Sequence, residues 1–484
     1  MKKTKSLCPE CLKVIPAQIY EEKGKIMIEK ECPEHGSFKD VYWSDKKLYD
    51  KFSRWSYQGK PEVFNTQTDK GCPFDCGLCP EHKSSTMLGL IDLTNRCNQK
   101  CPMCFANSAA AGYLYEPTLE EIRMMLELFR KEKPPCPAIQ FSGGEPTVRE
   151  NLPQIIKMAK EMGFIQIQIA TNGVKLARDI DFCRKLKEAG LNTIYLQFDG
   201  VTEEPYRIIR GYNALPNKLK AIQNCSMAGL KSIVLVPTLI KGINDHEVGD
   251  IVRFAVKNLD VVRGVNFQPV SFEGRVENQE REKGRITIPD LLKLLEKQTN
   301  KEIPASSFYP VPFVVPFSKF IEGWKGKKQF QLSVHPHCGA ATYVVIEKGK
   351  FLPITEFINV EKLIQFLDEN AEKLDSKLKK GIAIASLANI LRKFIKRDKV
   401  PEGFNVVALL ADILGVGNRQ ALANFHRKAI FIGAMHFMDP YNFDLQRVQR
   451  CGIHYATPDK RIIPFCSYNA IHRPIVEKKF AKPL

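Results

Sequence analysis

The stretch Cys97-Asn98-Gln99-Lys100-Cys101-Pro102-Met103-Cys104 is the most informative part of this chain, because it gathers three cysteines in one short loop. Three thiolates at this spacing can bind three irons of a 4Fe-4S cube and leave the fourth iron open for chemistry. A structural zinc site would normally need a fourth ligand. The triplet follows an apolar, strand-like run over Met87–Thr94. We therefore expect the cysteine loop at the end of a strand, where α/β enzymes place their active sites.

A second motif, Gly143-Gly144-Glu145-Pro146, follows the strand-like run Ala138–Ser142. Its glycines let backbone approach a ligand closely, and the glutamate offers a carboxylate. In this order the two motifs resemble those of the radical S-adenosylmethionine (SAM) superfamily. The resemblance implies that Cys97, Cys101 and Cys104 bind a catalytic 4Fe-4S cluster whose open iron is chelated by the methionyl end of SAM. It also implies that the Gly-Gly-Glu-Pro run meets the methionyl amine of SAM.

From Met87 onward, short apolar runs alternate with amphipathic segments. Six strand–helix units predict an α/β fold, a right-handed, parallel, partial (β/α)6 TIM-like barrel. Thr118 is the expected N-cap of a helix with a glutamate-rich first turn. The expected strands after the first are Ala138–Ser142, Ile165–Thr171, Thr193–Asp199, Ser232–Ile240 and Val265–Val270.

Polar residues stand at the ends of these strands, and in a barrel those ends face one mouth together with the cysteine loop. By resemblance we expect Thr171, Asn172, Gln197 and Asn244 to line the SAM pocket. The alternative for each is a turn residue or a helix cap.

The amino-terminal segment contains a separate metal motif. Cys8, Cys11 and Cys32 flank a hairpin-like stretch over Gln18–Ile28, and they are expected to bind one mononuclear Fe or Zn ion in a rubredoxin-like or zinc knuckle. His35 is a candidate fourth ligand, and a solvated histidine is the alternative. Such a small lobe cannot build a core alone, so a structural metal is its expected role.

Further cysteines indicate auxiliary clusters. Cys72, Cys76 and Cys79 repeat the spacing of the catalytic triplet, which favours a second 4Fe-4S cluster over a zinc knuckle. Cys338, Cys451 and Cys466 each stand beside Gly, His or Pro in loop-like sequence. We expect them to form a third cluster or to share ligands with the second, with Cys338 a candidate to complete the Cys72 set. The single cysteines Cys136, Cys183 and Cys225 are expected to be small buried hydrophobes.

These motifs divide the chain into four expected regions: a metal lobe (1–45), a linker with the auxiliary triplet (46–86), the radical SAM partial barrel (87–285), and an α+β auxiliary-cluster and substrate domain (286–484). Within the last, Phe425–Phe443 is dense in methionine and phenylalanine. A core helix or an apolar tunnel for a long chain would explain that composition.

Composition describes an ordinary folded protein. The chain has 484 residues, 44% hydrophobic and 26% charged, with a formal charge of +18. The charge indicates an anionic partner or a solvated basic surface, and nucleic acid is not expected because Lys and Arg form no long block. Met1–Leu7 lacks a following apolar segment and the apolar runs are too short to span a bilayer. With fifteen cysteines, a reducing cytoplasmic location and metal binding are expected.

The long-range layout resembles the archaeal tetraether lipid synthases. That resemblance implies an oxidoreductase that forms C–C bonds between terminal methyl carbons of phytanyl chains on archaeal diether phospholipids, through hydrogen abstraction by a 5'-deoxyadenosyl radical. A reductant such as a ferredoxin and peripheral membrane contact are then expected. The alternative is a radical SAM methylase acting on a pterin (methanopterin) precursor. A non-enzymatic iron-sulfur carrier or a nucleic-acid-binding zinc protein would leave the Gly143-Gly144-Glu145-Pro146 motif unexplained.

Overall fold

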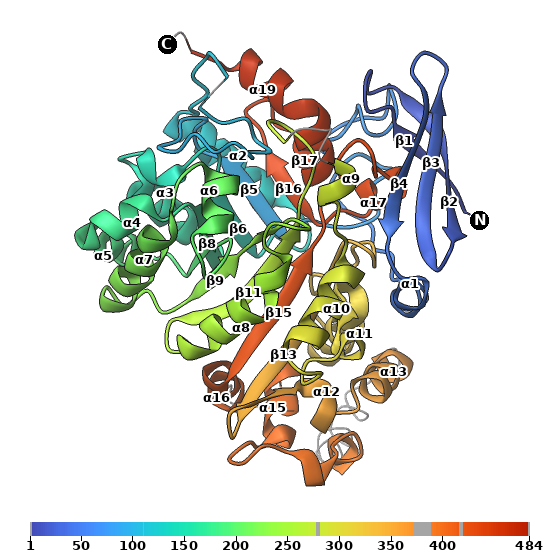
Figure 1. Cartoon of the computed structure of the whole chain (residues 1–484), viewed down its shortest axis with the longest axis vertical. Helices are drawn as coiled ribbons and strands as arrows, with labels where there is room; N and C mark the ends of the chain where they lie inside the picture. The colour runs from blue at the N-terminus through green and yellow to red at the C-terminus, as the bar shows by residue number, and fades with distance from the viewer. Residues whose placement is uncertain (1, 110, 277–280, 372–388, 416–419, 483–484) are drawn as a thin grey trace.

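The computed structural model describes residues 2–109, 111–276, 281–371, 389–415 and 420–482 (Figure 1). The chain begins with a four-stranded antiparallel sheet in the order β1-β2-β3-β4, followed by helix α1 (Lys46–Ser53). The β2–β3 hairpin turns through Lys23 and Gly24, both with positive φ, as a two-residue hairpin loop requires. This confirms the hairpin expected over Gln18–Ile28. The strands are β1 (Lys2–Leu7), β2 (Val14–Glu22), β3 (Lys25–Cys32) and β4 (Gly36–Trp43).

The centre of the molecule is a run of six parallel strands in the order β5-β6-β7-β8-β9-β11. All six strands predicted from the sequence are present. The predicted strand Ser232–Ile240 is divided at Pro237, which has no N–H to donate to a neighbouring strand. The bounds are β5 (Leu88–Asp92), β6 (Ala138–Ser142), β7 (Gln166–Thr171), β8 (Thr193–Gln197), β9 (Ile233–Val236), β10 (Thr238–Leu239) and β11 (Val262–Pro269).

Helices cover the outer side of these strands (Figure 1). Thr118 caps α2 as expected, since its side chain accepts from the Glu121 amide while the Glu121 carboxylate accepts from the Thr118 amide. The buried face of α2 includes Phe129, whose ring occupies the space that a side chain at Gly89 in β5 would need. The helices are α2 (Leu119–Lys131), α3 (Leu152–Glu161), α4 (Val174–Arg178), α5 (Ile180–Glu188), α6 (Glu204–Arg210), α7 (Leu215–Met227) and α8 (Val248–Lys257).

The carboxyl-terminal third extends the same sheet at both edges, which the sequence did not indicate. Strand β15 (Ala429–Met435) runs parallel to β11, and β16 (Ile453–Ala456) runs parallel to β5. The sheet therefore continues across the expected boundary at residue 285 (Figure 1). The outer strands are β12 (Tyr309–Pro310), β13 (Gly339–Glu347) and β14 (Lys350–Pro353) at one end and β17 (Ile462–Pro464) at the other.

The core helix considered for Phe425–Phe443 is wrong. Helix α16 (Gln420–Lys428) ends before Ala429, and the next seven residues form β15, which pairs with a strand on each side. A strand between two neighbours satisfies its backbone groups and buries apolar side chains as well as a helix does.

The remaining helices surround this part of the sheet. The sequence also predicts helical segments over Val360–Leu374, Leu378–Arg397 and Phe404–Leu414. The first corresponds to α13 as far as Ala371, the third contains α15, and most of the second lies outside the described residues. Within the described part of the chain, no helix combines the length and apolar character needed to cross a membrane. The helices are α9 (Arg281–Gly284), α10 (Ile288–Gln298), α11 (Val315–Lys325), α12 (Ile354–Phe357), α13 (Val360–Ala371), α15 (Val406–Ile413), α17 (Leu445–Val448), α18 (Phe465–Ser467) and α19 (Arg473–Lys479).

Candidate active site and metal centres

A cavity of about 440 Å³ opens where the parallel strands end. The barrel strands, the cysteine loop and residues from the carboxyl-terminal third all contribute to its wall. Every residue predicted to bind the catalytic cluster or SAM, except Asn244, lines it: Cys97, Cys101, Cys104, Gly143, Gly144, Glu145, Thr171, Asn172 and Gln197.

The two glycines hold the start of the cysteine loop. The amide of Gly144 donates to the Thr94 carbonyl (2.7 Å), and the amide of Glu145 donates to the Arg96 carbonyl (2.9 Å). A Cβ at Gly143 or Gly144 would overlap these same carbonyl oxygens, and Gly143 has a φ of 126°. The close approach that requires glycine here is therefore to the backbone leading into Cys97.

The carboxylate of Glu145 is bound by the protein itself. One oxygen accepts from the hydroxyls of Thr147 (2.6 Å) and Thr171 (2.7 Å), and the other accepts from the Asn172 amide (2.7 Å). Burial raises the pKa of Glu145, while these donors oppose the rise. The Glu145 side chain thus joins the loop after β6 to the end of β7. Because its carboxylate is already bonded, the Gly-Gly-Glu run presents its backbone alongside the cavity.

Asn172 and Gln197 are positioned by a buried lysine that the sequence reasoning missed. The ammonium group of Lys218 donates to the Asn172 carbonyl (2.6 Å) and to the Gln197 side chain (3.1 Å). Lys218 is fully buried on α7, and burial lowers its pKa to about 8. The side-chain amide of Asn172 in turn donates to the side-chain oxygen of Asn98 (2.7 Å). This bond ties the end of β7 to the cysteine loop. The signal for this role in the sequence was a lysine on the apolar face of the segment that forms α7.

Asn244 does not reach the cavity. Its side-chain amide donates to the carbonyls of Asp199 and Thr238 (both 2.8 Å), and its oxygen accepts from the Ile240 amide (2.9 Å). The structure therefore places Asn244 as a turn residue, the alternative considered above. Arg210 faces the cavity instead, paired with Asp199 through two 2.8 Å bonds.

A second loop, after β11, holds the cysteine loop from the other side. The Arg275 amide donates to the Cys104 carbonyl (3.1 Å), and its guanidinium donates to the Cys101 carbonyl (3.2 Å). A Cβ at Gly274 would overlap the Cys104 carbonyl. Sequence reasoning missed this loop, although a Gly-Arg pair just past a strand end was a signal.

The thiols of Cys97, Cys101 and Cys104 suit an iron-sulfur cluster. All are free and line one cavity. Burial raises the pKa of Cys97 to about 12, and the neighbouring Cys101 and Cys104 add to the rise. Gathering thiolates in a buried site is unfavourable unless a cation binds them, and iron bound by thiolates provides that cation.

The deep part of the cavity has two unlike walls. The barrel strands contribute polar side chains, among them Gln140, whose oxygen accepts from Gln168 (2.6 Å). The carboxyl-terminal third contributes an apolar wall, where the rings of Phe437 and Phe465 stack 3.7 Å apart. Such a cavity suits a flat molecule that has a hydrogen-bonding edge for the polar wall and an apolar face for the aromatic rings. Other polar lining residues are Tyr195, Asn266 and Gln268, and other apolar ones are Met435, Ile453 and Tyr455.

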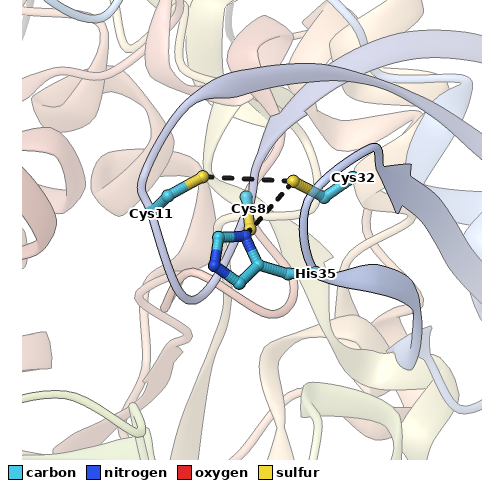
Figure 2. A group of neighbouring side chains, drawn as sticks. All are labelled: Cys8, Cys11, Cys32 and His35. Atoms are coloured by element: carbon cyan, nitrogen blue, oxygen red, sulfur yellow. Dashed lines mark hydrogen bonds between the residues drawn. The ribbon is translucent and has the colours of Figure 1, made fainter.

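The amino-terminal motif forms a four-ligand group. The ligand atoms of Cys8, Cys11, Cys32 and His35 lie within 4.8 Å of one another (Figure 2). His35 Nδ1 is 3.5 Å from the Cys32 sulfur and 3.7 Å from the Cys8 sulfur. Ligands of a tetrahedral zinc or iron site are separated by about 3–4 Å, so the group fits one mononuclear metal ion. The β1–β2 and β3–β4 turns bring the four residues together.

The auxiliary cysteines form two neighbouring sets. Cys72, Cys76 and Cys79 line one small cavity, and the Ser467 hydroxyl donates to the Cys76 sulfur (3.2 Å). Burial raises the pKa of Cys451 to about 12, with Cys338 and Cys76 adding to the rise. Burial likewise raises the pKa of Cys466, with Cys451 and Cys338 contributing.

The influence of Cys338 on the pKa of both Cys451 and Cys466 favours a set of these three cysteines over the arrangement in which Cys338 completes the Cys72 set. The buried guanidinium of Arg447 lies near Cys338 and Cys466, where it can balance thiolate charge. The single cysteines Cys136, Cys183 and Cys225 are fully buried, as expected.

Comparison with known proteins agrees with the metal and cofactor sites described above. The family model "Radical SAM superfamily" matches residues 91–255, and "HMPTM N-terminal zinc ribbon domain" matches residues 1–44. The 7,8-dihydro-6-hydroxymethylpterin dimethyltransferase of Methanocaldococcus jannaschii is 55% identical over 100% of this chain and 96% of its own length.

More distant matches cover the barrel region. The GTP 3',8-cyclase of Clostridium acetobutylicum is 28% identical over 42% of this chain, and the matched region covers 61% of that relative. The crystal structure of Streptococcus suis SuiB bound to S-adenosylmethionine is 17% identical, with a TM-score of 0.36 over 45% of each chain.

These findings overturn the expected lipid chemistry. A relative 55% identical over the whole chain is a pterin dimethyltransferase, which contradicts C–C coupling of phytanyl chains and a diether phospholipid substrate. The polar barrel wall agrees with this correction, because it offers hydrogen-bonding groups that a pterin can use and an alkyl chain cannot. The expectation of an oxidoreductase is corrected in the same way, since that relative is a methyltransferase.

SAM and a 4Fe-4S cluster are the cofactors of the superfamily, and the thiols and glycine-rich loop described above fit them. The zinc ribbon match fits the mononuclear metal group at Cys8, Cys11, Cys32 and His35. The chain therefore belongs to the radical SAM superfamily, in the family of the M. jannaschii dimethyltransferase.

Proposed function

We propose that this protein is a radical SAM methyltransferase that replaces hydrogens of 7,8-dihydro-6-hydroxymethylpterin by methyl groups. The observation that carries the proposal is 55% identity over the entire chain to an enzyme of that name. The cavity supports it independently. A pterin is a flat ring system with hydrogen-bonding groups along its edge, and the cavity pairs a polar barrel wall with stacked aromatic rings.

In this proposal Cys97, Cys101 and Cys104 bind the catalytic cluster, and the backbone of Gly143–Glu145 binds the methionyl group of SAM. When bound, these cofactors supply a 5'-deoxyadenosyl radical that abstracts hydrogen from an inert C–H bond. Thr171 supports Glu145, and the Lys218 ammonium holds Asn172 and Gln197 at the cavity wall. The protein's contribution is to position the C–H bond and exclude water.

The auxiliary cysteines are proposed to hold one or two further 4Fe-4S clusters. Support comes from the two buried thiol sets, around Cys76 and around Arg447. The division into regions 1–45, 46–86, 87–285 and 286–484 stays a proposal. The last two regions contribute strands to one sheet, so they are joined by it. A low-potential reductant such as a ferredoxin is the proposed electron donor.

The test is an anaerobic reaction of reconstituted protein with SAM, reductant and 7,8-dihydro-6-hydroxymethylpterin. We expect 5'-deoxyadenosine together with a pterin whose mass has increased by one or two methyl groups. SAM with a deuterated methyl group would show whether SAM is the methyl source. Formation of 5'-deoxyadenosine with an unchanged pterin would contradict the proposed function and leave the radical chemistry intact.

A further inference from the structure

Two polar side-chain atoms in the loop after β11 are buried in the cavity wall without partners. The Glu273 oxygen Oε1 and the Ser271 hydroxyl are shielded from solvent, and neither has a hydrogen-bond partner among the described residues. Both residues line the main cavity. A carboxyl oxygen buried without a partner is costly, and a bound ligand with a hydrogen-bond donor would remove that cost.

The protein holds Glu273 firmly in this position. On one side, Gly274 and Arg275 pack against the Cys104 carbonyl and fix the loop to the cysteine loop. On the other side, the Phe272 amide donates to the Asp439 carboxylate (3.0 Å). With both neighbours of Glu273 anchored, the backbone that carries its side chain is fixed at the cavity wall.

The nearby cation does not neutralise Glu273. Arg473 lines the same cavity, but its guanidinium is already bonded to Asp92 (2.5 Å) and Glu477 (3.1 Å). Burial raises the pKa of Glu273 well above its usual range, Asp439 raises it further, and Arg473 only partly opposes the rise. The carboxyl group is thus left for a ligand.

We propose that Glu273 recognises the 2-amino-pyrimidinone edge of the pterin. This inference rests on the proposed function and names the residue that selects its substrate. As a carboxylate, Glu273 would accept from the 2-amino group and from the N3–H beside it. As a neutral acid, it would accept from the amino group and donate to N1. Each protonation state therefore matches one side of the 2-amino group.

The experiment is an anaerobic equilibrium-binding measurement on the reconstituted holoenzyme. Its two probes are 7,8-dihydro-6-hydroxymethylpterin and the same pteridine with hydrogen in place of the 2-amino group. The variants are Glu273→Ala and, as a matched control, Glu188→Ala, an exposed glutamate on α5. We expect Glu273→Ala to weaken pterin binding by about 10- to 100-fold and to change binding of the deamino probe much less. Glu188→Ala should change neither.

Glu273→Gln guards against misfolding of the alanine variant. Its amide can accept from the 2-amino group and donate to N1, so it should bind the pterin more tightly than Glu273→Ala. Cluster absorbance and SAM binding would report that each variant is folded. Equal losses for both probes, or unchanged pterin binding in Glu273→Ala, would overturn the inference while leaving the proposed function standing. Failure of the unsubstituted protein to bind the pterin would overturn both.

Discussion

The two cysteine triplets share one spacing but occupy opposite environments. Cys97, Cys101 and Cys104 line a cavity of about 440 Å³ that has room for a substrate. The residues around Cys72, Cys76 and Cys79 enclose about 10 Å³, and the Ser467 hydroxyl is bonded to the Cys76 sulfur. One triplet is thus built to meet ligands, and the other is packed beneath the carboxyl-terminal segment.

The difference teaches that spacing decides whether three thiols can bind a cluster, whereas the neighbouring elements decide what that cluster can do. The catalytic loop is held between two loops that end in the cavity, at Gly144 and at Arg275. The auxiliary loop is held by α18 and the segment that follows it, where His472 bonds to the Pro73 carbonyl (2.9 Å). Its cluster would lie between this segment and a separate pocket of about 700 Å³ that Cys72 also lines, away from the substrate cavity.

The largest expected effect comes from removing one thiol from each triplet. Cys101→Ala should lower 5'-deoxyadenosine formation by more than about a thousandfold, because the open-iron cluster cannot assemble. Cys76→Ala should keep this SAM cleavage while methyl transfer to the pterin fails. Product analysis and iron content of both variants check the contrast. Equal loss of SAM cleavage in the two variants would show that the triplets are not functionally distinct.

A smaller effect is expected from a matched pair of glycines beside the triplets. A Cβ at Gly144 would overlap the Arg96 carbonyl, which is backbone and cannot rotate away, whereas a Cβ at Gly77 would overlap only the Thr66 side chain. We expect Gly144→Ala to lower the free energy of unfolding by about 2–3 kcal/mol and Gly77→Ala by about 1 kcal/mol. Denaturant unfolding measures both, and the reverse order would contradict the packing described for the cysteine loop.

A third effect, which depends on pH, concerns the segment that joins the triplets. Its Thr86 amide donates to the buried carboxyl of Glu132 (3.1 Å), and burial raises the pKa of Glu132 to about 7. Because the folded protein holds this proton more tightly than the unfolded chain, the stabilisation is complete below about pH 4.5 and is lost as pH rises through about 7. The loss amounts to about 3 kcal/mol.

Glu132→Gln should therefore remove this decline and unfold at higher denaturant than the unsubstituted protein at about pH 8. Glu127→Gln is the control and should keep the decline, because Glu127 is exposed on α2, the helix that ends just before Glu132. Parallel pH profiles for Glu132→Gln and the unsubstituted protein would contradict the assignment.

The barrel strands and cofactor motifs could be predicted from the sequence because their signals are local. Strand β6 was predicted with its observed bounds, since a short apolar run ends directly at Gly143. Local patterns did not reveal Lys218, because a lysine in a helix shows its role only when the helix packs on the ends of β7 and β8. Asn244 was placed in the pocket because it follows a strand, yet its turn folds back on itself.

By itself, the sequence determined the cofactor chemistry of this protein, because three thiols in one loop and a glycine-rich turn carry that chemistry within a few residues. Only the tertiary structure decided the shape and polarity of the substrate cavity. Strands β15 and β16, distant in the chain, join both edges of the barrel sheet and bring Met435 and Tyr455 to face Gln140 and Gln168. Substrate selection depends on contacts between distant segments, which no local pattern records.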